Sequence, residues 1–182
     1  VPDAGNIVFG DTGYIDYDSE TDAGATNPDD IDEIRSTSTV ATWGIDANRE
    51  AVIIDVGGVD TINAGDGDDI VIGGRFGDTI RARSGDNIVF GDSGRILAAT
   101  VDSATQPHFD GQPITLGRVE TIEDTDGGAD TILTLTGYDM VLGGHGGDTI
   151  TVSLISNLDD QTETVPDAGN IVFGDTGYID YD

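Results

Sequence analysis

The sequence predicts an all-β protein, a parallel β-roll or β-solenoid in which short strands stack between acidic turns and from which loops or hairpins are inserted. Three observations predict this fold. Asp residues recur nine positions apart at Asp60, Asp69 and Asp78, and an aliphatic residue stands two positions after each. Asp is abundant, and Gly is present 27 times. Asp is a poor helix former that fits tight turns, so helices are expected to be few.

The nine-residue step divides into a turn and a short strand. The aliphatic positions of this step are Ile62, Val71, Ile80, Val89, Ile132, Val141 and Ile150. Strands this short cannot bury a face alone, but parallel stacking buries a continuous aliphatic stripe. We therefore expect two nine-residue units to make each coil of the stack.

Three long segments interrupt the step, at 14–44, 97–120 and 152–169, and are interpreted as loops or protruding hairpins. Several strands are apolar at three consecutive positions, as in 70–72 and 88–90. Continuous apolar runs are typical of strands that are covered on both faces. We therefore expect part of the long segments to pack over the outside of the roll.

The chain also contains an internal repeat of larger period. Residues 1–18 recur without change as 165–182. The predicted organisation is one full tandem unit over 1–164, with pseudo-halves at about 6–86 and 87–169, followed by the start of the next unit. We expect neighbouring identical repeats in the same chain, within a much larger protein.

The charge of the chain points to cations as partners. Acidic residues number 36 against 7 basic ones, which gives a formal net charge of -29. Such self-repulsion opposes compaction unless counter-ions neutralise it, and it disfavours nucleic acid and anionic membranes as partners. No Cys is present, and two His are too few for a typical zinc site. No apolar run has the length of a membrane span, and the first residues lack the pattern of a signal peptide.

One nonapeptide carries a recognisable motif. Residues 143–151, GGHGGDTIT, fit the pattern G-G-x-G-x-D-x-U-x, and partial copies stand at 64–72, 73–81 and 82–90. The chain therefore resembles the RTX, or hemolysin-type, family of calcium-binding β-rolls. Glycines let a turn present its carbonyl oxygens, and a hard cation takes several carboxylate and carbonyl oxygens. The resemblance implies that each of several Ca²⁺ ions lies between turns two units apart on the same edge of the roll.

The matching turns are 18 residues apart in sequence. Asp60 with Asp78, and Asp130 with Asp148, are the expected pairs on one edge. On the other edge Asp69 meets Asn87, which lacks a charge and predicts a weaker site, and Asp139 has Asn157 at this distance. The expected metal ligands are Asp60, Asp69, Asp78, Asn87, Asp130, Asp139 and Asp148, with Gly65, Gly67, Gly73, Gly143, Gly144 and Gly146 contributing backbone carbonyls or turn geometry.

Weaker sites are expected at Asp11, Asp92 and Asp175, which occupy the recurrent FGD[ST]G sequence. Gly-Asp turns can also form without an ion, with Asp bonding the nearby backbone. Several turns in one register, together with the unexplained net charge, favour calcium here. The same segments resemble short protease signatures, but Ser93 is replaced by Thr12 and Thr176 in the other copies. We expect no enzymatic activity.

The sequence supports a calcium-binding structural repeat that folds on calcium outside the cell. It would serve as a spacer or adhesive stalk of a giant bacterial surface or secreted protein, and the resemblance implies type I secretion. An alternative is an accessory RTX module of an extracellular enzyme, such as a protease, lipase or polysaccharide-modifying enzyme. A third hypothesis assigns carbohydrate or surface binding to the long segments, although their sequence identifies no ligand.

Overall fold

The structure is a computed structural model, and it describes residues 4–17, 30–37, 42–45, 51–54, 57–100, 107–153 and 169–181. Its strands are β1 (Ile7–Phe9), β2 (Gly13–Tyr17), β3 (Ile31–Ser36), β4 (Thr42–Ile45), β5 (Ala51–Ile54), β6 (Thr61–Gly65), β7 (Ile70–Ile72), β8 (Thr79–Ala82), β9 (Ile88–Phe90), β10 (Gly94–Ala98), β11 (Leu116–Thr121), β12 (Thr131–Thr134), β13 (Met140–Leu142), β14 (Thr149–Val152), β15 (Ile171–Phe173) and β16 (Tyr178–Asp180). The described residues include no helix, and so no helix among them could cross a membrane. The expected all-β class is confirmed.

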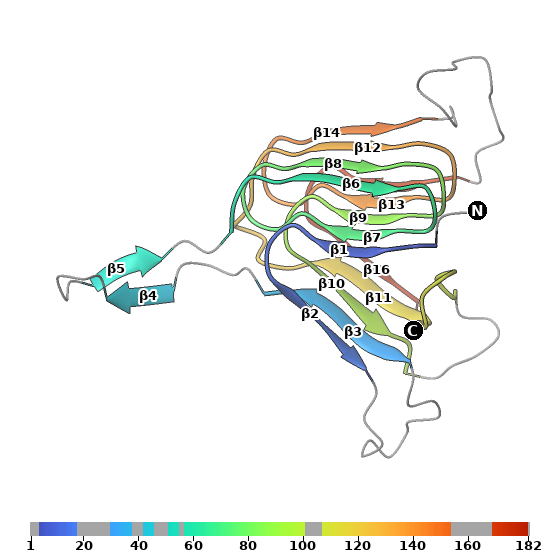
Figure 1. The fold of residues 1–182 in the computed structure, drawn as a ribbon, viewed down its shortest axis with the longest axis horizontal. Helices are drawn as coiled ribbons and strands as arrows, with labels where there is room; N and C mark the ends of the chain where they lie inside the picture. The colour runs from blue at the N-terminus through green and yellow to red at the C-terminus, as the bar shows by residue number, and fades with distance from the viewer. Residues whose placement is uncertain are drawn as a thin grey trace.

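Two parallel sheets form the part of the fold that the nine-residue step encodes (Figure 1). Sheet A has the order β1-β7-β9-β13-β15, and sheet B has the order β6-β8-β12-β14. Consecutive nine-residue units alternate between the sheets, so residues 18 apart are paired, as Ile62 with Ile80 and Val71 with Val89. We call one strand of each sheet, with its turns, a coil. The expectation of two units in each coil is confirmed.

The long segment between β9 and β12 leaves this register intact. Ile80 of β8 pairs directly with Ile132 of β12, and Val89 of β9 pairs with Val141 of β13. Both pairs are 52 residues apart rather than 18. The chain therefore leaves the stack after β9 and re-enters it one coil further along.

The excursions form a third sheet rather than loops. Sheet C is antiparallel, with the order β2-β3-β10-β11-β16, and it lies against sheet A on the side opposite sheet B (Figure 1). The pairs β2–β3 and β10–β11 are hairpins, as expected for 14–44 and 97–120, but the expectation that they protrude was wrong, because they pack on sheet A. Only β4 and β5 form a separate hairpin, which projects away from the other sheets in the figure. Most of 152–169 lies outside the described residues.

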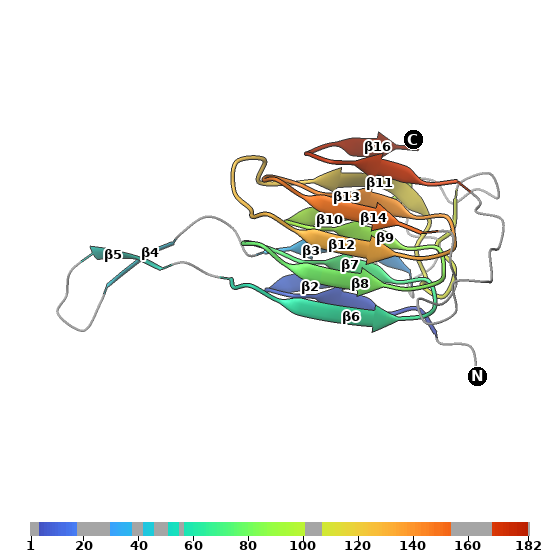
Figure 2. The same cartoon turned by 90° about the horizontal axis from the view of Figure 1, so that it is seen from above.

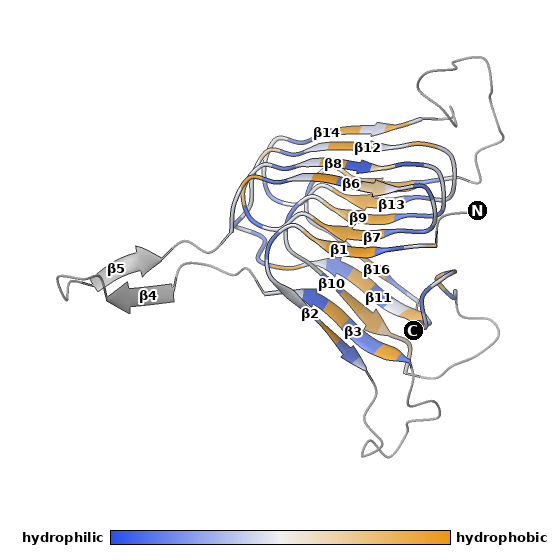
Figure 3. Cartoon of the chain, in the orientation of Figure 1, coloured by the Kyte–Doolittle hydropathy of each residue, from blue (hydrophilic) through white to orange (hydrophobic). Residues whose placement is uncertain are grey.

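Two apolar layers hold the three sheets together. Between sheets A and B, Val71, Val89 and Val141 pack against Ile62 and Ile80. The other layer separates sheets A and C, and its members include Ile31, Ile34, Ile70, Ile72, Ile88, Phe90, Ile96, Leu116, Val119 and Leu142. Figure 3 shows the strands of sheet A as continuously hydrophobic.

The predicted cover over the outside of the roll is confirmed. Ile70 and Phe90 are 0% exposed and Ile72 is 1% exposed, because sheet C lies over them. The excursions are needed since strands that are apolar at three consecutive positions present hydrophobic side chains on both faces.

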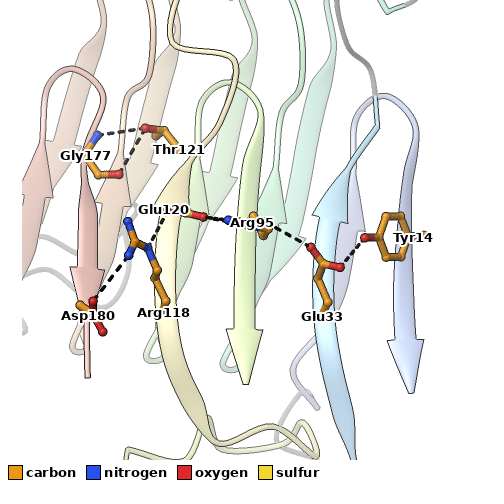
Figure 4. A network of polar contacts seen from close by, with 8 residues as sticks. All are labelled: Tyr14, Glu33, Arg95, Arg118, Glu120, Thr121, Gly177 and Asp180. Atoms are coloured by element: carbon orange, nitrogen blue, oxygen red, sulfur yellow. Dashed lines mark hydrogen bonds and ion pairs between the residues drawn. The ribbon is translucent and has the colours of Figure 1, made fainter. Parts of the chain in front are cut away.

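A row of polar side chains crosses sheet C (Figure 4). Tyr14 of β2 donates a hydrogen bond to Glu33 of β3, and Arg95 of β10 pairs with Glu120 of β11. Arg118 donates to Glu120 at 2.6 Å. The row thus links neighbouring strands by side chains as well as by backbone hydrogen bonds.

The buried position of Ile72 yields a stability prediction. Ile72→Val removes one methylene from the layer between sheets A and C, so the free energy of unfolding should fall by about 0.5–1.5 kcal/mol. Chemical denaturation at saturating calcium measures this change. Val59→Ala is the control, since Val59 is 76% exposed and its truncation should have little effect. Equal effects of the two variants would contradict the covering role of sheet C.

Candidate metal sites at the turns

The chain turns between the parallel sheets at two edges. Edge 1 comprises the turns that lead into strands of sheet B, and edge 2 comprises the turns that lead into strands of sheet A. Each predicted Asp or Asn stands immediately before a strand. Edge 1 carries Asp60, Asp78, Asp130 and Asp148, and edge 2 carries Asn6, Asp69, Asn87, Asp139 and Asn170.

The carboxylates of edge 1 form one hydrogen-bonded ladder. The N–H of Asp60 donates to Oδ1 of Asp78 at 2.7 Å. The N–H of Asp78 donates to Oδ1 of Asp130 at 2.7 Å, and that of Asp130 to Oδ1 of Asp148 at 3.0 Å. The structure therefore brings together both expected pairs, and it joins them through the contact of Asp78 with Asp130, which the 18-residue rule does not predict.

The second oxygen of these carboxylates faces the interior of the edge. Oδ2 of Asp78, of Asp130 and of Asp148 is buried and accepts no hydrogen bond from the described residues. A buried carboxylate oxygen without a donor is costly, since its hydration is lost and not replaced. These atoms fit the charge and chemistry of a cation ligand.

Backbone carbonyl oxygens approach the same atoms. A Cβ built on Gly73 would lie 2.6 Å from Oδ2 of Asp78 and would overlap the carbonyl oxygen of Gly91. A Cβ on Gly143 would overlap Oδ2 of Asp148 in the same way. The first glycine of the motif is therefore required for close approach. Its φ is not in the left-handed region, whereas Gly144 and Gly146 have φ of 100° and 142°.

At edge 2 the predicted glycines Gly65 and Gly67 also adopt left-handed φ, of 111° and 110°. Among the described Asp, Glu and His side chains, no group of three converges to form a metal centre. At edge 1 each turn contributes one Asp to the ladder. A cation bound there would therefore need backbone oxygens as further ligands.

Asp11 and Asp92 clamp neighbouring turns of edge 1. Oδ1 of Asp92 accepts the N–H of Gly128 at 2.8 Å, and its Oδ2 accepts the N–H of His145 at 2.5 Å. Asp11 binds the N–H groups of Gly58 and Arg75 in the same way, at 2.9 and 2.7 Å. Each of these two carboxylates thus accepts backbone N–H groups from two different turns.

Asp175, the third residue predicted as a weaker ligand in the FGD[ST]G sequence, is exposed. Asp11 and Asp92 thus differ from it in being held between two turns. The sequence recurrence found all three positions but not the backbone amides that two of them bind.

The electrostatics of edge 1 oppose full ionisation. Burial is the main cause that raises the pKa of Asp78 to about 7 and that of Asp130 to about 6, and neighbouring carboxylates add to it. Burial, together with the charges of Asp130 and Asp148, raises the pKa of Asp92 to about 8, against hydrogen bonds that lower it. Burial and the nearby Asp11 raise the pKa of Asp60. The guanidinium of Arg75, in a turn of edge 1, pairs with Asp126, and negative charge still exceeds positive charge along the four stacked carboxylates.

Edge 2 has a different chemistry, because Asn alternates with Asp. The side-chain nitrogen of Asn87 donates to Oδ1 of Asp139 at 2.8 Å and to the carbonyl oxygens of Gly85 and Arg83 at 2.9 and 3.2 Å. One amide group therefore faces a carboxylate and two carbonyls, the oxygen types that a cation would bind. The N–H of Asp69 donates to Oδ1 of Asn87 at 3.1 Å, so this expected pair also forms.

Sequence reasoning missed two members of edge 2. Asn6 donates from both its backbone and its side chain to Oδ1 of Asp69, at 2.8 and 3.0 Å. Asp139 donates its N–H to Oδ1 of Asn170 at 2.8 Å, so its neighbour in the ladder is not Asn157, which lies outside the described residues. The repeated NIVFGD sequence could have indicated Asn6 and Asn170, since it always begins with Asn.

The raised pKa values predict how stability depends on pH without calcium. A carboxyl whose pKa is higher in the folded than in the unfolded state stabilises the fold at low pH, and this contribution is lost as pH rises through the folded value. The ordinary pKa of an Asp is 3.8, and the folded values of Asp130, Asp78 and Asp92 are about 6, 7 and 8, so the loss should begin near pH 4 and be complete by about pH 8.

Circular dichroism in chelator tests this expectation. The strand signal should be greater at pH 5 than at pH 8, because protonated carboxyls do not repel one another. A strand signal in chelator that increases from pH 5 to pH 8 would contradict the stacking of uncompensated carboxylates at edge 1.

Comparisons with known proteins support the assignment of the turns. The RTX calcium-binding nonapeptide repeat, in its four-copy form, matches residues 52–80, 63–95 and 124–153. Edge 1 residues Asp60, Asp78, Asp130 and Asp148 all lie within these matches. Comparison with curated proteins and with solved structures gives no match.

Proposed function

Since the chain carries RTX calcium-binding nonapeptide repeats within residues 52–153, we propose that it is a structural module that binds several Ca²⁺ ions and thereby folds as a β-roll outside the cell. Sheets A and B are the walls of this roll, and sheet C is an apolar cover over one wall. Edge 1 is the principal calcium site, and edge 2 is secondary.

The observation that carries the proposal is the row of buried carboxylate oxygens at edge 1. Asp78, Asp130 and Asp148 each have a buried Oδ2 without a hydrogen-bond donor among the described residues. These oxygens and the carbonyls near Gly73, Gly91 and Gly143 would hold the ions. Calcium accepts such mixed oxygen ligands in flexible geometry, whereas Mg²⁺ prefers strict octahedra and retains water. Bound ions would neutralise the excess negative charge of the four stacked carboxylates at edge 1.

Calcium would couple folding to location. In low calcium the net charge of -29 opposes compaction, so the chain stays unfolded and can be exported. At the higher calcium concentrations outside the cell, ions bind the folded state alone and stabilise it by mass action. The proposed role is a spacer or adhesive stalk of a large bacterial surface or secreted protein, because identical units can extend a stack without changing its core.

An accessory RTX module of an extracellular enzyme is the alternative role. The RTX repeat is a structural unit rather than a catalytic one, so catalysis would belong to another part of such a protein. A catalytic domain beside few repeats in the parent protein supports this alternative, and many repeats without one support the stalk.

Calcium-dependent folding can be tested by titration. The far-ultraviolet strand signal should develop cooperatively with added calcium, and equimolar magnesium should not reproduce it. A strand signal that is the same in chelator as in calcium would contradict the folding role.

Asp148→Asn tests edge 1 directly. The substitution keeps an oxygen that can accept the N–H of Asp130 but removes the charge, so calcium affinity should fall by about tenfold or more. Isothermal titration calorimetry measures the affinity and the number of ions. Asp110→Asn is the matched control, because Asp110 is exposed in a turn away from edge 1. Unchanged affinity and stoichiometry in Asp148→Asn would exclude this residue as a ligand, and the more drastic Asp148→Ala should be at least as damaging.

Asn87→Asp tests the contrast between the edges. It replaces the amide that binds Asp139, Gly85 and Arg83 by a carboxylate, so three acids, at positions 69, 87 and 139, become consecutive at edge 2. The variant should bind calcium more tightly, or bind one ion more, than the wild-type chain. Asn63→Asp, the same change at an exposed position of β6, should do neither. Equal calcium binding by both variants would show that the amide of Asn87 does not take the place of an ion.

A further inference from the structure

The two copies of the repeated sequence lie at opposite ends of the stack. Residues 5–16 and 169–180 are identical. The first copy forms β1 and β2 at one margin of sheets A and C, and the second forms β15 and β16 at the other margin (Figure 2). The same sequence therefore pairs with different neighbouring strands in its two copies.

In sheet A the two copies use different backbone groups. The carbonyl of Asn6 accepts the N–H of Ile70, and the N–H of Gly10 donates to Ile72 of β7. The second copy instead uses the N–H of Ile171, which donates to the carbonyl of Asp139. The N–H of Gly174, the counterpart of Gly10, lies at the margin of the sheet. A strand of this sequence can therefore make both pairings at once.

The side chains divide in the same way. Asn170 uses its side-chain oxygen to accept the N–H of Asp139, whereas Asn6 uses its side-chain nitrogen to bind Asp69. The same Asn can thus link the last turn of one unit to the first full turn of another.

Sheet C repeats this division. Figure 4 shows Asp180 of β16 paired with Arg118 at one margin, and Tyr14 of β2 bonded to Glu33 at the other. Tyr178, the counterpart of Tyr14, also contacts Arg118, whose Cζ atom lies 4.4 Å from the centre of the Tyr178 ring. Val172, with 47% of its surface exposed, is the counterpart of Val8, which packs into the layer between sheets A and B. The margin formed by β15 and β16 therefore presents the same apolar and polar side chains that β1 and β2 use in packing at the opposite margin.

We infer that this margin seats the next repeat unit of the same chain, so that β15 and β16 are at once the last strands of one unit and the first of the next. The next unit's counterparts of β7 and β3 would pair with β15 and β16, and its counterparts of Gly58 and Arg75 would bind Asp175. Units then continue without a linker as one stack. The inference rests on the tandem organisation and not on the number of calcium ions.

This joint fixes the length of the array. One unit contributes β1, β7, β9 and β13 to sheet A, and β15 is already the β1 of its successor. Four strands at about 4.8 Å extend the stack by about 19 Å for each unit. The contact is head to tail and does not close on itself, so it generates an open rod.

Hydrogen exchange on a chain of two units, with residue 164 followed directly by a second copy of residues 1–182, tests the joint. At saturating calcium the amides of Gly10 and Asp11, which bind the carbonyls of Ile72 and Gly73, should be protected in one-unit and two-unit chains. The amides of Gly174 and Asp175 should exchange fast in the one-unit chain and at least about tenfold more slowly at the internal joint of the two-unit chain. NMR with isotopic label confined to the joint distinguishes the identical segments.

Fast exchange of Gly174 and Asp175 at the joint, beside protected Gly10 and Asp11, would overturn the inference in favour of separate beads. Val172→Asp at the joint should abolish the added protection, because it places a carboxylate in the apolar layer, while Asn63→Asp at an exposed position of β6 should keep it. Protection that is equal in calcium and in chelator would contradict the calcium proposal. The joint would still be tested by the exchange rate of the Gly174 amide in the one-unit and two-unit chains.

Discussion

The fold depends on the stacking of carboxylates at edge 1. Each coil places an Asp directly before a strand of sheet B, so like charges repeat at the spacing of neighbouring strands, about 4.8 Å. At an effective dielectric constant of about 20, two such charges repel by roughly 3–4 kcal/mol. Four of them, Asp60, Asp78, Asp130 and Asp148, share this edge. The parallel register that buries the aliphatic stripe therefore also stacks like charges, which bound cations would neutralise.

Edge 2 meets the same geometric constraint without stacking acid on acid. Asn87 separates Asp69 from Asp139, and Asn6 and Asn170 flank them, so each ladder contact joins an Asn to an Asp. The side-chain nitrogens of Asn6 and Asn87 donate to the carboxylates of Asp69 and Asp139. Amide nitrogens donate where a bare carboxylate would repel. The two edges of one stack thus differ in how much they require an ion, although their turns have the same length and similar sequence.

Sheet C gives the module a core that ordinary turns could not supply. Strands of sheet A are apolar on both faces, so one face packs toward sheet B and the other is covered by β3, β10 and β11. The excursions after β1 and β9 begin with Asp11 and Asp92, whose carboxylates bind backbone amides of adjacent turns. The same carboxylates that tie the excursions to the stack also add negative charge to edge 1.

The sequence by itself determined the strands of sheets A and B, their alternation between these two sheets and the acidic residues of both edges, because a nine-residue step records which residues share a face and an edge. It also indicated that something must cover Ile70, Ile72 and Phe90. Only the tertiary structure decided that the cover is an antiparallel sheet, that Asp78 meets Asp130, and that Asn170 follows Asp139. These contacts depend on where a chain returns after a long excursion. The return point is set by the packing of sheet C on sheet A, which local periodicity does not encode.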